Sequence, residues 1–150
     1  MADICTYGTY AKLFVLDLGI QWAGAIPAII FKTEKYYDLL GALTNVSLAV
    51  GSYVLGQTKS TRQLVQSLMV VAWASRLGVF LFRRILKDGH DKRFKEAKQK
   101  PTMMFVFWTI QGAWCYITLL PTIMLNEQTR NPPLGPQVKR FIVPIIKFTD

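Results

Sequence analysis

Four long apolar stretches, separated by short polar segments, constrain this chain more than any other feature. They cover residues 13–31, 39–56, 64–86 and 103–125. A helix needs about 20 apolar residues to cross the hydrocarbon core of a bilayer, and each stretch is close to that length. Lipid offers no hydrogen-bond partners to the backbone, which favours helices that satisfy their own polar groups. The sequence therefore predicts an all-α fold, a multi-pass transmembrane helical bundle with about four spans.

The composition divides the chain into two parts. Residues 1–128 contain all four apolar stretches and are predicted to form the transmembrane domain. Residues 129–150 form a polar, proline-rich tail that ends with a short apolar segment at residues 141–148. That segment is too short to cross a bilayer, and Pro144 interrupts it. We therefore expect the tail to lie at the membrane interface or to be disordered.

The charge and the rare metal-binding residues exclude two classes of function. The net charge of +9 is typical of nucleic-acid-binding proteins, but eight of the 18 basic residues lie between residues 83 and 100. Basic residues concentrated in one loop between apolar stretches indicate membrane orientation rather than a nucleic-acid groove. The chain has one histidine, His90, and two distant cysteines. We therefore expect no nucleic-acid partner and no metal site.

The same basic residues predict the orientation. With four spans, the 32–38 and 83–102 loops lie on one side of the membrane and hold ten basic residues, against seven on the other side. Loops rich in lysine and arginine stay in the cytoplasm. We therefore place the 83–102 loop in the cytoplasm and both termini on the far side.

Arg76 interrupts the third apolar stretch and needs an explanation. A charge at the centre of a membrane helix costs roughly 2.5–3.5 kcal/mol on insertion scales unless it has a partner or a water-filled cavity. Arg83 lies seven residues later and hence on nearly the same helix face. Two such guanidinium groups suit an anionic ligand, because arginine holds phosphate bidentately. The alternative is a structural pair with a buried carboxylate, for which Asp17 is the obvious candidate.

Two further patterns predict local structure. The second apolar stretch carries small residues at helical spacing, which indicates a face that packs closely on neighbouring helices: Gly41, Thr44, Ser47 and Gly51. The segment 83–94 (RRILKDGHDKRF) contains a predicted helix stop at Gly89. Its turn mixes both signs of charge, as a loop contacting phosphate or ribose requires. The alternative is a solvated basic loop that faces lipid headgroups.

Two stretches carry a resemblance to a known family, namely residues 35–50 (KYYDLLGALTNVSLAV) and 73–94 (WASRLGVFLFRRILKDGHDKRF). The second contains Trp-x-x-Arg-Leu-Gly and then Gly-x-Asp-x-Arg-Phe. Together they resemble the membrane-protein family of unknown function that is related to steroid 5-alpha-reductases. The resemblance covers roughly residues 30–128. The matching positions are Tyr37, Asp38, Gly41, Thr44, Trp73, Arg76, Leu77, Gly78, Arg83, Gly89, Asp91, Arg93 and Phe94.

The resemblance implies that residues 1–128 are the amino-terminal part of a reductase. Such an enzyme would bind NADPH from the cytoplasmic side and reduce a carbon–carbon double bond in a lipid or steroid-like substrate. It implies membrane lipids as partners and, in a eukaryotic cell, the endoplasmic reticulum or another endomembrane. Asp38 is the implied catalytic acid. The implied cofactor-binding residues are Arg76, Arg83, Gly89, Asp91, Arg93 and Phe94.

The later helices of that family, which complete the cofactor site, have no counterpart in this chain. Whether the chain is itself an enzyme is therefore left open. The alternative function is that of a non-enzymatic integral membrane protein, whose basic cytoplasmic loop binds anionic lipids or partners.

Overall fold

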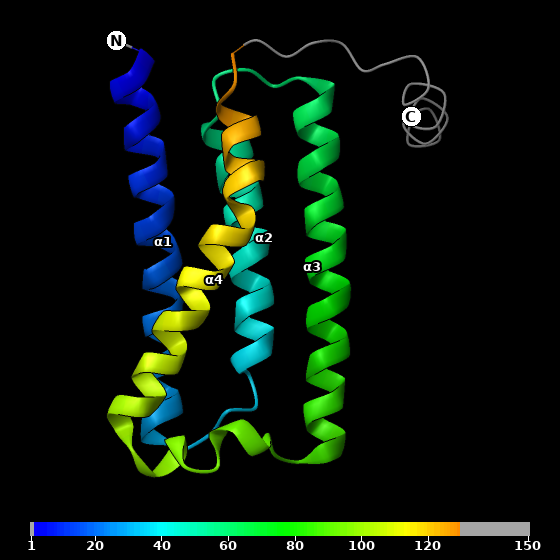
Figure 1. The fold of residues 1–150 in the computed structure, drawn as a ribbon. Coiled ribbons are helices and arrows are strands. Elements are labelled where there is room, and N and C mark those ends of the chain that lie inside the picture. Colours follow the sequence, from blue (N-terminus) through cyan, green and yellow to red (C-terminus); the bar gives the residue numbers. More distant parts are fainter. Residues whose placement is uncertain (1, 130–150) are drawn as a thin grey trace.

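Four long helices run side by side in the computed structural model, which describes residues 2–129 (Figure 1). Each of the four is long and apolar enough to cross a membrane. The prediction of an all-α bundle with four spans is thus confirmed for this part of the chain, whereas the predicted tail falls, from residue 130 on, outside it. The elements are α1 (Ala2–Ile30), α2 (Tyr37–Leu55), α3 (Thr61–Asp88), the 3-10 turns η1 (Lys92–Phe94) and η2 (Ala97–Gln99), and α4 (Pro101–Glu127).

The helix ends follow local side-chain chemistry rather than hydropathy. α1 begins at Ala2, well before residue 13, because hydropathy marks the membrane-crossing part of a helix and not its end. Ser60 begins α3 with a capping box: its side chain accepts from the Gln63 backbone N–H at 3.4 Å, and the Gln63 side chain accepts from the Ser60 N–H at 2.9 Å. Gly89 ends α3 with a φ of 78°, which confirms the predicted helix stop.

α2 is the central helix, because it packs against each of the other three. α3 lies mainly against α2, whereas α1 and α4 contact both α2 and each other. The predicted small-residue face of α2 is confirmed where Gly41 and Thr44 are buried and Gly51 lies against Leu13. α3 comes equally close on another side, where a Cβ built on Gly78 would lie 2.5 Å from the Ala42 Cβ.

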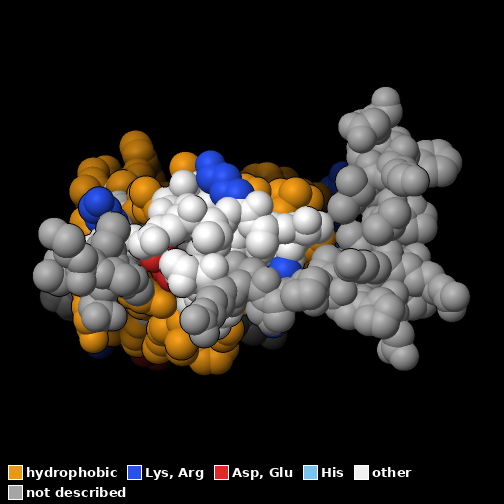
Figure 2. All heavy atoms as spheres, turned by 90° about the horizontal axis from the view of Figure 1, so that it is seen from above, with side chains coloured by type: hydrophobic (Ala, Val, Ile, Leu, Met, Phe, Trp, Pro, Cys, Tyr) orange, Lys and Arg blue, Asp and Glu red, His pale blue; other side chains and the backbone are white. Residues whose placement is uncertain are grey.

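Large apolar side chains cover most of the outside of the bundle, whereas most polar side chains lie within it or at its ends, with Arg76 on the outer face of α3 as an exception. Seen end-on, apolar groups form the rim of the molecule (Figure 2). Exposed examples include Leu68 and Phe80 on α3 and Trp114 on α4. A water-soluble monomer does not expose apolar surface on this scale, but lipid covers it without cost. The chain is therefore an integral membrane protein.

The close approach at Gly78 gives the first prediction. Gly78→Ala should lower the free energy of unfolding by about 1–3 kcal/mol, because the new methyl group pushes α3 away from α2. Helicity monitored by circular dichroism during denaturation in detergent micelles measures this change. Gly19→Ala, where nothing lies within 4 Å, is the matched control and should be neutral or stabilising. Equal stability of wild type and Gly78→Ala would contradict the packing.

Candidate anion site at one end of the bundle

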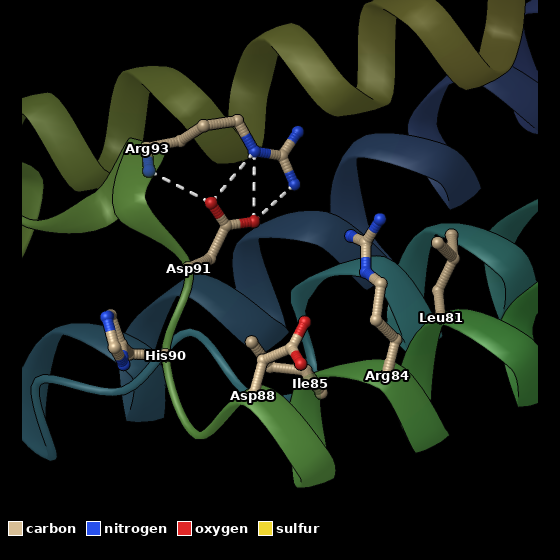
Figure 3. A pocket seen from close by; sticks show the side chains of 7 residues that line it. All are labelled: Leu81, Arg84, Ile85, Asp88, His90, Asp91 and Arg93. Carbon is tan, nitrogen blue, oxygen red and sulfur yellow. Dashed lines mark hydrogen bonds and ion pairs between the residues drawn. The ribbon is translucent and has the colours of Figure 1, made fainter.

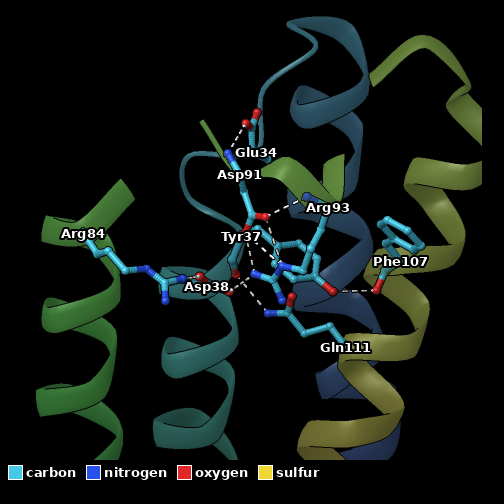
Figure 4. A network of polar contacts seen from close by, with 8 residues as sticks. All are labelled: Glu34, Tyr37, Asp38, Arg84, Asp91, Arg93, Phe107 and Gln111. Carbon is cyan, nitrogen blue, oxygen red and sulfur yellow. Dashed lines mark hydrogen bonds and ion pairs between the residues drawn. The ribbon is translucent and has the colours of Figure 1, made fainter. Parts of the chain in front are cut away.

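The loop between α1 and α2 and the loop between α3 and α4 meet at the same end of the bundle, as the sequence predicts (Figure 1). A buried carboxylate joins them. Glu34, from the first loop, is 4% exposed, and its Oε2 lies 2.6 Å from Nζ of Lys98 in the second loop. Its Oε1 accepts a hydrogen bond from the Asp91 backbone N–H at 3.0 Å (Figure 4). Glu34 therefore fixes the second loop at two points.

The environment of Glu34 determines its ionisation. Burial alone would raise the pKa of this carboxyl group, but the hydrogen bonds from Lys98 and from the Asp91 backbone outweigh it. The net effect is a pKa below the ordinary value of 4.5. Glu34 is thus a carboxylate at neutral pH, with both oxygens engaged.

An aromatic cluster anchors the same loop to the helices. Phe94 is 2% exposed, and its ring packs edge-on against Tyr37, at 4.7 Å between centroids, and against Phe107, at 5.4 Å. The Tyr37 hydroxyl donates to the Phe107 carbonyl at 2.9 Å, and the Gln111 side chain donates to the Tyr37 carbonyl at 2.9 Å (Figure 4). Since the cluster joins α2 to α4, residues around Phe94 are held against a rigid support.

Two arginines converge on one acid beside this cluster. Asp38, in the first turn of α2, lies 3.6 Å from Arg84 of α3 and 3.6 Å from Arg93 of the loop (Figure 4). Arg93 also donates from Nε to both carboxylate oxygens of Asp91, at 3.1 and 2.9 Å. The hydrogen bond from Arg93 lowers the pKa of Asp91, and the same bond raises the pKa of Arg93. Three elements thereby place their charges together.

Arg84, Asp91 and Arg93 border an open pocket of about 800 Å³ between the last turns of α3 and the following loop (Figure 3). A neighbouring pocket of about 470 Å³ shares His90 and Asp91 and is lined in addition by Lys95 and Lys98. Both pockets are lined by basic side chains and lie at the end of the bundle where the two loops meet. The larger one is lined by Leu81, Arg84, Ile85, Asp88, His90, Asp91 and Arg93.

The structure brings together three of the residues implied by the family resemblance: Asp38, Asp91 and Arg93. Gly89 forms the turn that leads into the site. Phe94 lies beneath it in the aromatic cluster, where its ring supports the loop. Whether these residues bind a cofactor stays a prediction.

Arg76 and Arg83 lie elsewhere. They share one face of α3, as their spacing predicts, but that face borders a separate pocket of about 470 Å³ with Ser75, Val79 and Phe80. Their part in cofactor binding stays a prediction as well.

The predicted alternative, a pair between Arg76 and Asp17, is wrong. Within residues 2–129 Asp17 has no hydrogen-bond partner, and it is buried against α4. The spacing showed that Arg76 and Arg83 share a face but not where that face points. α3 packs on α2, so its Arg76 is exposed on the outside of the bundle, away from α1.

Sequence reasoning missed three functional candidates: Glu34, Arg84 and Lys98. Arg84 carried a weak signal, because it shares a helix face with Leu81 and Asp88, at spacings of three and four. Glu34 and Lys98 are 64 positions apart, and no local pattern connects them.

The buried Glu34 pair gives the second prediction. A group whose pKa is lowered by folding stabilises the fold above its unfolded pKa and loses that contribution as pH falls through the folded value. The 89–100 loop should therefore become more open to hydrogen exchange as pH falls below about 4.5. Mass-spectrometric amide exchange, corrected for the intrinsic rate, measures this opening.

Two variants control that experiment. Glu34→Gln should open the loop already at pH 7 and reduce the pH dependence to the part that comes from Asp91, and Lys98→Ala should cost roughly 2 kcal/mol through the unpaired carboxylate. Glu96→Gln, at an exposed position of the same loop, should behave as wild type. If hydrogen exchange in Glu34→Gln equals that of the wild type, Glu34 does not hold the 89–100 loop in place.

Comparison with known proteins identifies a family but no closer relative. Neither the curated proteins nor the solved structures contain a match. A family model matches residues 26–148, a range that includes α2, α3, α4, both loops and the residues of the pocket. The chain therefore belongs to the family described as protein of unknown function (DUF1295).

Proposed function

We propose that this membrane protein binds NADPH through its phosphate groups at the Arg84–Arg93 pocket. The observation that carries the proposal is the pair of arginines from different elements, each 3.6 Å from Asp38. Arginine is the residue that best matches phosphate oxygens, because its planar fork presents several donors.

The geometry leaves the donors of Arg84 and one terminal amino group of Arg93 available, because Arg93 already donates from Nε and Nη2 to Asp91. A hydrogen bond from nitrogen to oxygen spans about 2.7–3.2 Å, so contacts of 3.6 Å attract without using the donors fully. The side chains of Arg84 and Arg93 are 46% and 59% exposed. Asp38, at 20%, orients both guanidinium groups toward each other. An incoming phosphate would therefore meet two guanidinium groups that Asp38 already holds in position.

The reaction follows from the resemblance to steroid 5-alpha-reductase-like proteins. NADPH supplies a hydride, and the protein supplies position and electrostatics. The proposed substrate is a lipid or steroid-like molecule with a carbon–carbon double bond, which reaches the pocket from the bilayer. Within this proposal Asp38 acts as a positioning residue, because it touches the two arginines that hold the cofactor.

The proposed orientation places this end of the bundle in the cytoplasm. Ten basic residues in its two loops support that side by the positive-inside rule. NADPH would then reach the pocket directly from the cytoplasm. In a eukaryotic cell, the endoplasmic reticulum or another endomembrane is the proposed location.

Binding of NADPH to the purified chain in lipid nanodiscs tests the proposal. Arg84→Ala and Arg93→Ala should each weaken binding by about tenfold or more, because each removes one charged phosphate contact. Arg62→Ala is the matched control, since Arg62 is exposed on the same helix at the opposite end, and it should bind as wild type. Fluorescence of the bound nicotinamide ring measures the dissociation constant.

Two outcomes would overturn the assignment. Absence of saturable NADPH binding by the wild type would overturn it for this chain. If NADPH affinity falls in Arg76→Ala but not in Arg84→Ala, the phosphate-binding site lies on the outer face of α3 instead.

The exposed lysines at the same end support a second candidate function, the binding of anionic lipid headgroups. Lysines near a membrane surface attract such lipids by roughly 1 kcal/mol each. They surround the pocket without lining the larger one: Lys32, Lys35, Lys87, Lys95 and Lys100.

Lipid exchange into nanodiscs of mixed composition separates the two functions. The double variant Lys87→Gln, Lys95→Gln should reduce enrichment of anionic lipid around the protein, and added salt should reduce it further. NADPH binding should stay as in the wild type. Equal enrichment in the variant and the wild type would contradict the lipid function.

A further inference from the structure

Seven buried side-chain oxygens of residues 2–129 lack a hydrogen-bond donor; two of them, on Asn126 and Glu127, lie at the end of α4, and five lie further inside the bundle. These five are both carboxylate oxygens of Asp17 and the amide oxygens of Gln21, Asn45 and Gln111. Asp17 and Gln21 have no exposed surface. Buried oxygens without partners are rare in folded proteins, and each one calls for a ligand or a structural reason.

Two of these residues lie near the middle of the membrane-spanning helices. Asp17 is near the middle of the span Tyr7–Ile30, and Asn45 is near the middle of α2. Cys115, which hydrogen-bonds Asn45, is near the middle of α4. Asp17, Asn45 and Cys115 are therefore far from either aqueous surface, whereas Gln111 lies nearer the end of α2 that begins at Tyr37.

Contacts between the helices surround Asp17 and Gln21. A Cβ on Gly112 would lie 3.2 Å from Asp17 Oδ2 and 3.1 Å from Gln21 Cγ, so the α4 backbone touches both residues. Gln21 in turn reaches α2, where its Nε2 donates to the Thr44 hydroxyl at 3.0 Å. α1, α2 and α4 thus enclose Asp17.

The amide groups cannot turn their donors to the carboxylate without losing existing bonds. Gln21 uses its nitrogen on Thr44, and Gln111 uses its nitrogen on the Tyr37 carbonyl at 2.9 Å. These bonds fix which end of each amide stays free, and in both cases it is the oxygen. These five oxygens are acceptors, which favour a bound cation, although the Trp108 Nε1 of α4 is a buried donor that also lacks a partner among residues 2–129.

No protein charge neutralises Asp17 among residues 2–129. On α1 the nearest cation is Lys12, which is exposed. The charged residues described on α2 and α4 are Asp38 and Glu127, both acids at helix ends. Arg76 lies on the outer face of α3. An unpaired charge in the membrane interior is costly, so either a proton on the carboxyl group or a cation from outside the chain balances it.

We propose that Asp17 is the charged ligand of a sodium site within the membrane, with the amide oxygens of Gln21, Asn45 and Gln111 as neutral ligands. One carboxylate balances one positive charge, which indicates a monovalent ion. Oxygen ligands match alkali cations. At Gly112 the α4 backbone lies against Asp17 and Gln21, and we take sodium, the smaller of the two common alkali cations, as the ligand. Gln111 also belongs to the cluster beneath the proposed NADPH pocket, whereas Asp17 and Gln21 are not among the residues that line that pocket.

Binding of radioactive sodium to the protein in nanodiscs, with choline as the background cation, tests the site. The wild type should bind one sodium ion per chain, and Asp17→Asn should bind at least about tenfold more weakly. Glu127→Gln, the same change at the end of α4, is the matched control and should bind as wild type. Absence of saturable binding, or equal binding in Asp17→Asn, would overturn the proposal.

A second experiment uses the unaltered chain, in case Asp17→Asn fails to fold. A hydrophobic carbodiimide reacts with membrane-buried carboxyl groups, and mass spectrometry locates the product. Sodium should protect Asp17 at least about tenfold better than choline or potassium does, because the bound ion occupies the carboxylate. Labelling of Asp17 that sodium does not reduce would show a carboxyl group without a sodium ligand and would overturn the proposal.

Discussion

Hydrocarbon provides no hydrogen-bond partner and no counterion, and this constraint shapes the whole molecule. Apolar side chains cover most of the outside, so most polar groups either gather at a helix end or meet one another inside, and Arg76 on the outer face of α3 is an exception. Both solutions are present. Glu34, Asp38 and Asp91 meet their cations at one end, where long side chains can reach water. Asp17, by contrast, is buried within the bundle, and both of its carboxylate oxygens lack a hydrogen-bond partner among residues 2–129.

The end network depends on Glu34 more than on any other residue there. Its carboxylate binds the second loop through both a lysine side chain and a backbone N–H, and the loop then presents Arg93 beside Asp38. Without these two contacts of Glu34, the loop would no longer hold Arg93 near Arg84 of α3. The candidate site is therefore built by two loops, each too short to fold alone, which the buried ion pair of Glu34 and Lys98 holds together.

Hydropathy was sufficient to predict the four helices, because membrane insertion selects for length and apolarity along one segment at a time. The helix stop at Gly89 was equally local. Contacts between distant segments could not be predicted in this way. Arg83 and Arg84 have the same chemistry, yet only Arg84 faces the pocket, since one position rotates a side chain by about 100° around a helix. The pair of Glu34 and Lys98 depends on how two loops fold toward each other, which no spacing in the sequence encodes.

Arg76 and Asp17 lie at similar depth with opposite charges, yet α2 separates them. Pairing would require α3 to leave the close contact between Gly78 and Ala42, because α3 reaches the rest of the bundle mainly through α2. α1, α2 and α4 form a three-helix core, and α3 is joined to it by its packing on α2, by hydrogen bonds of its first turns with the end of α4, and by the ion pair of Arg84 with Asp38. The hydrogen bonds lie at one end of α3 and the ion pair lies at the other. An anion held by Arg84 and Arg93 would therefore strengthen the attachment of α3 at the end where only the ion pair now joins it to Asp38.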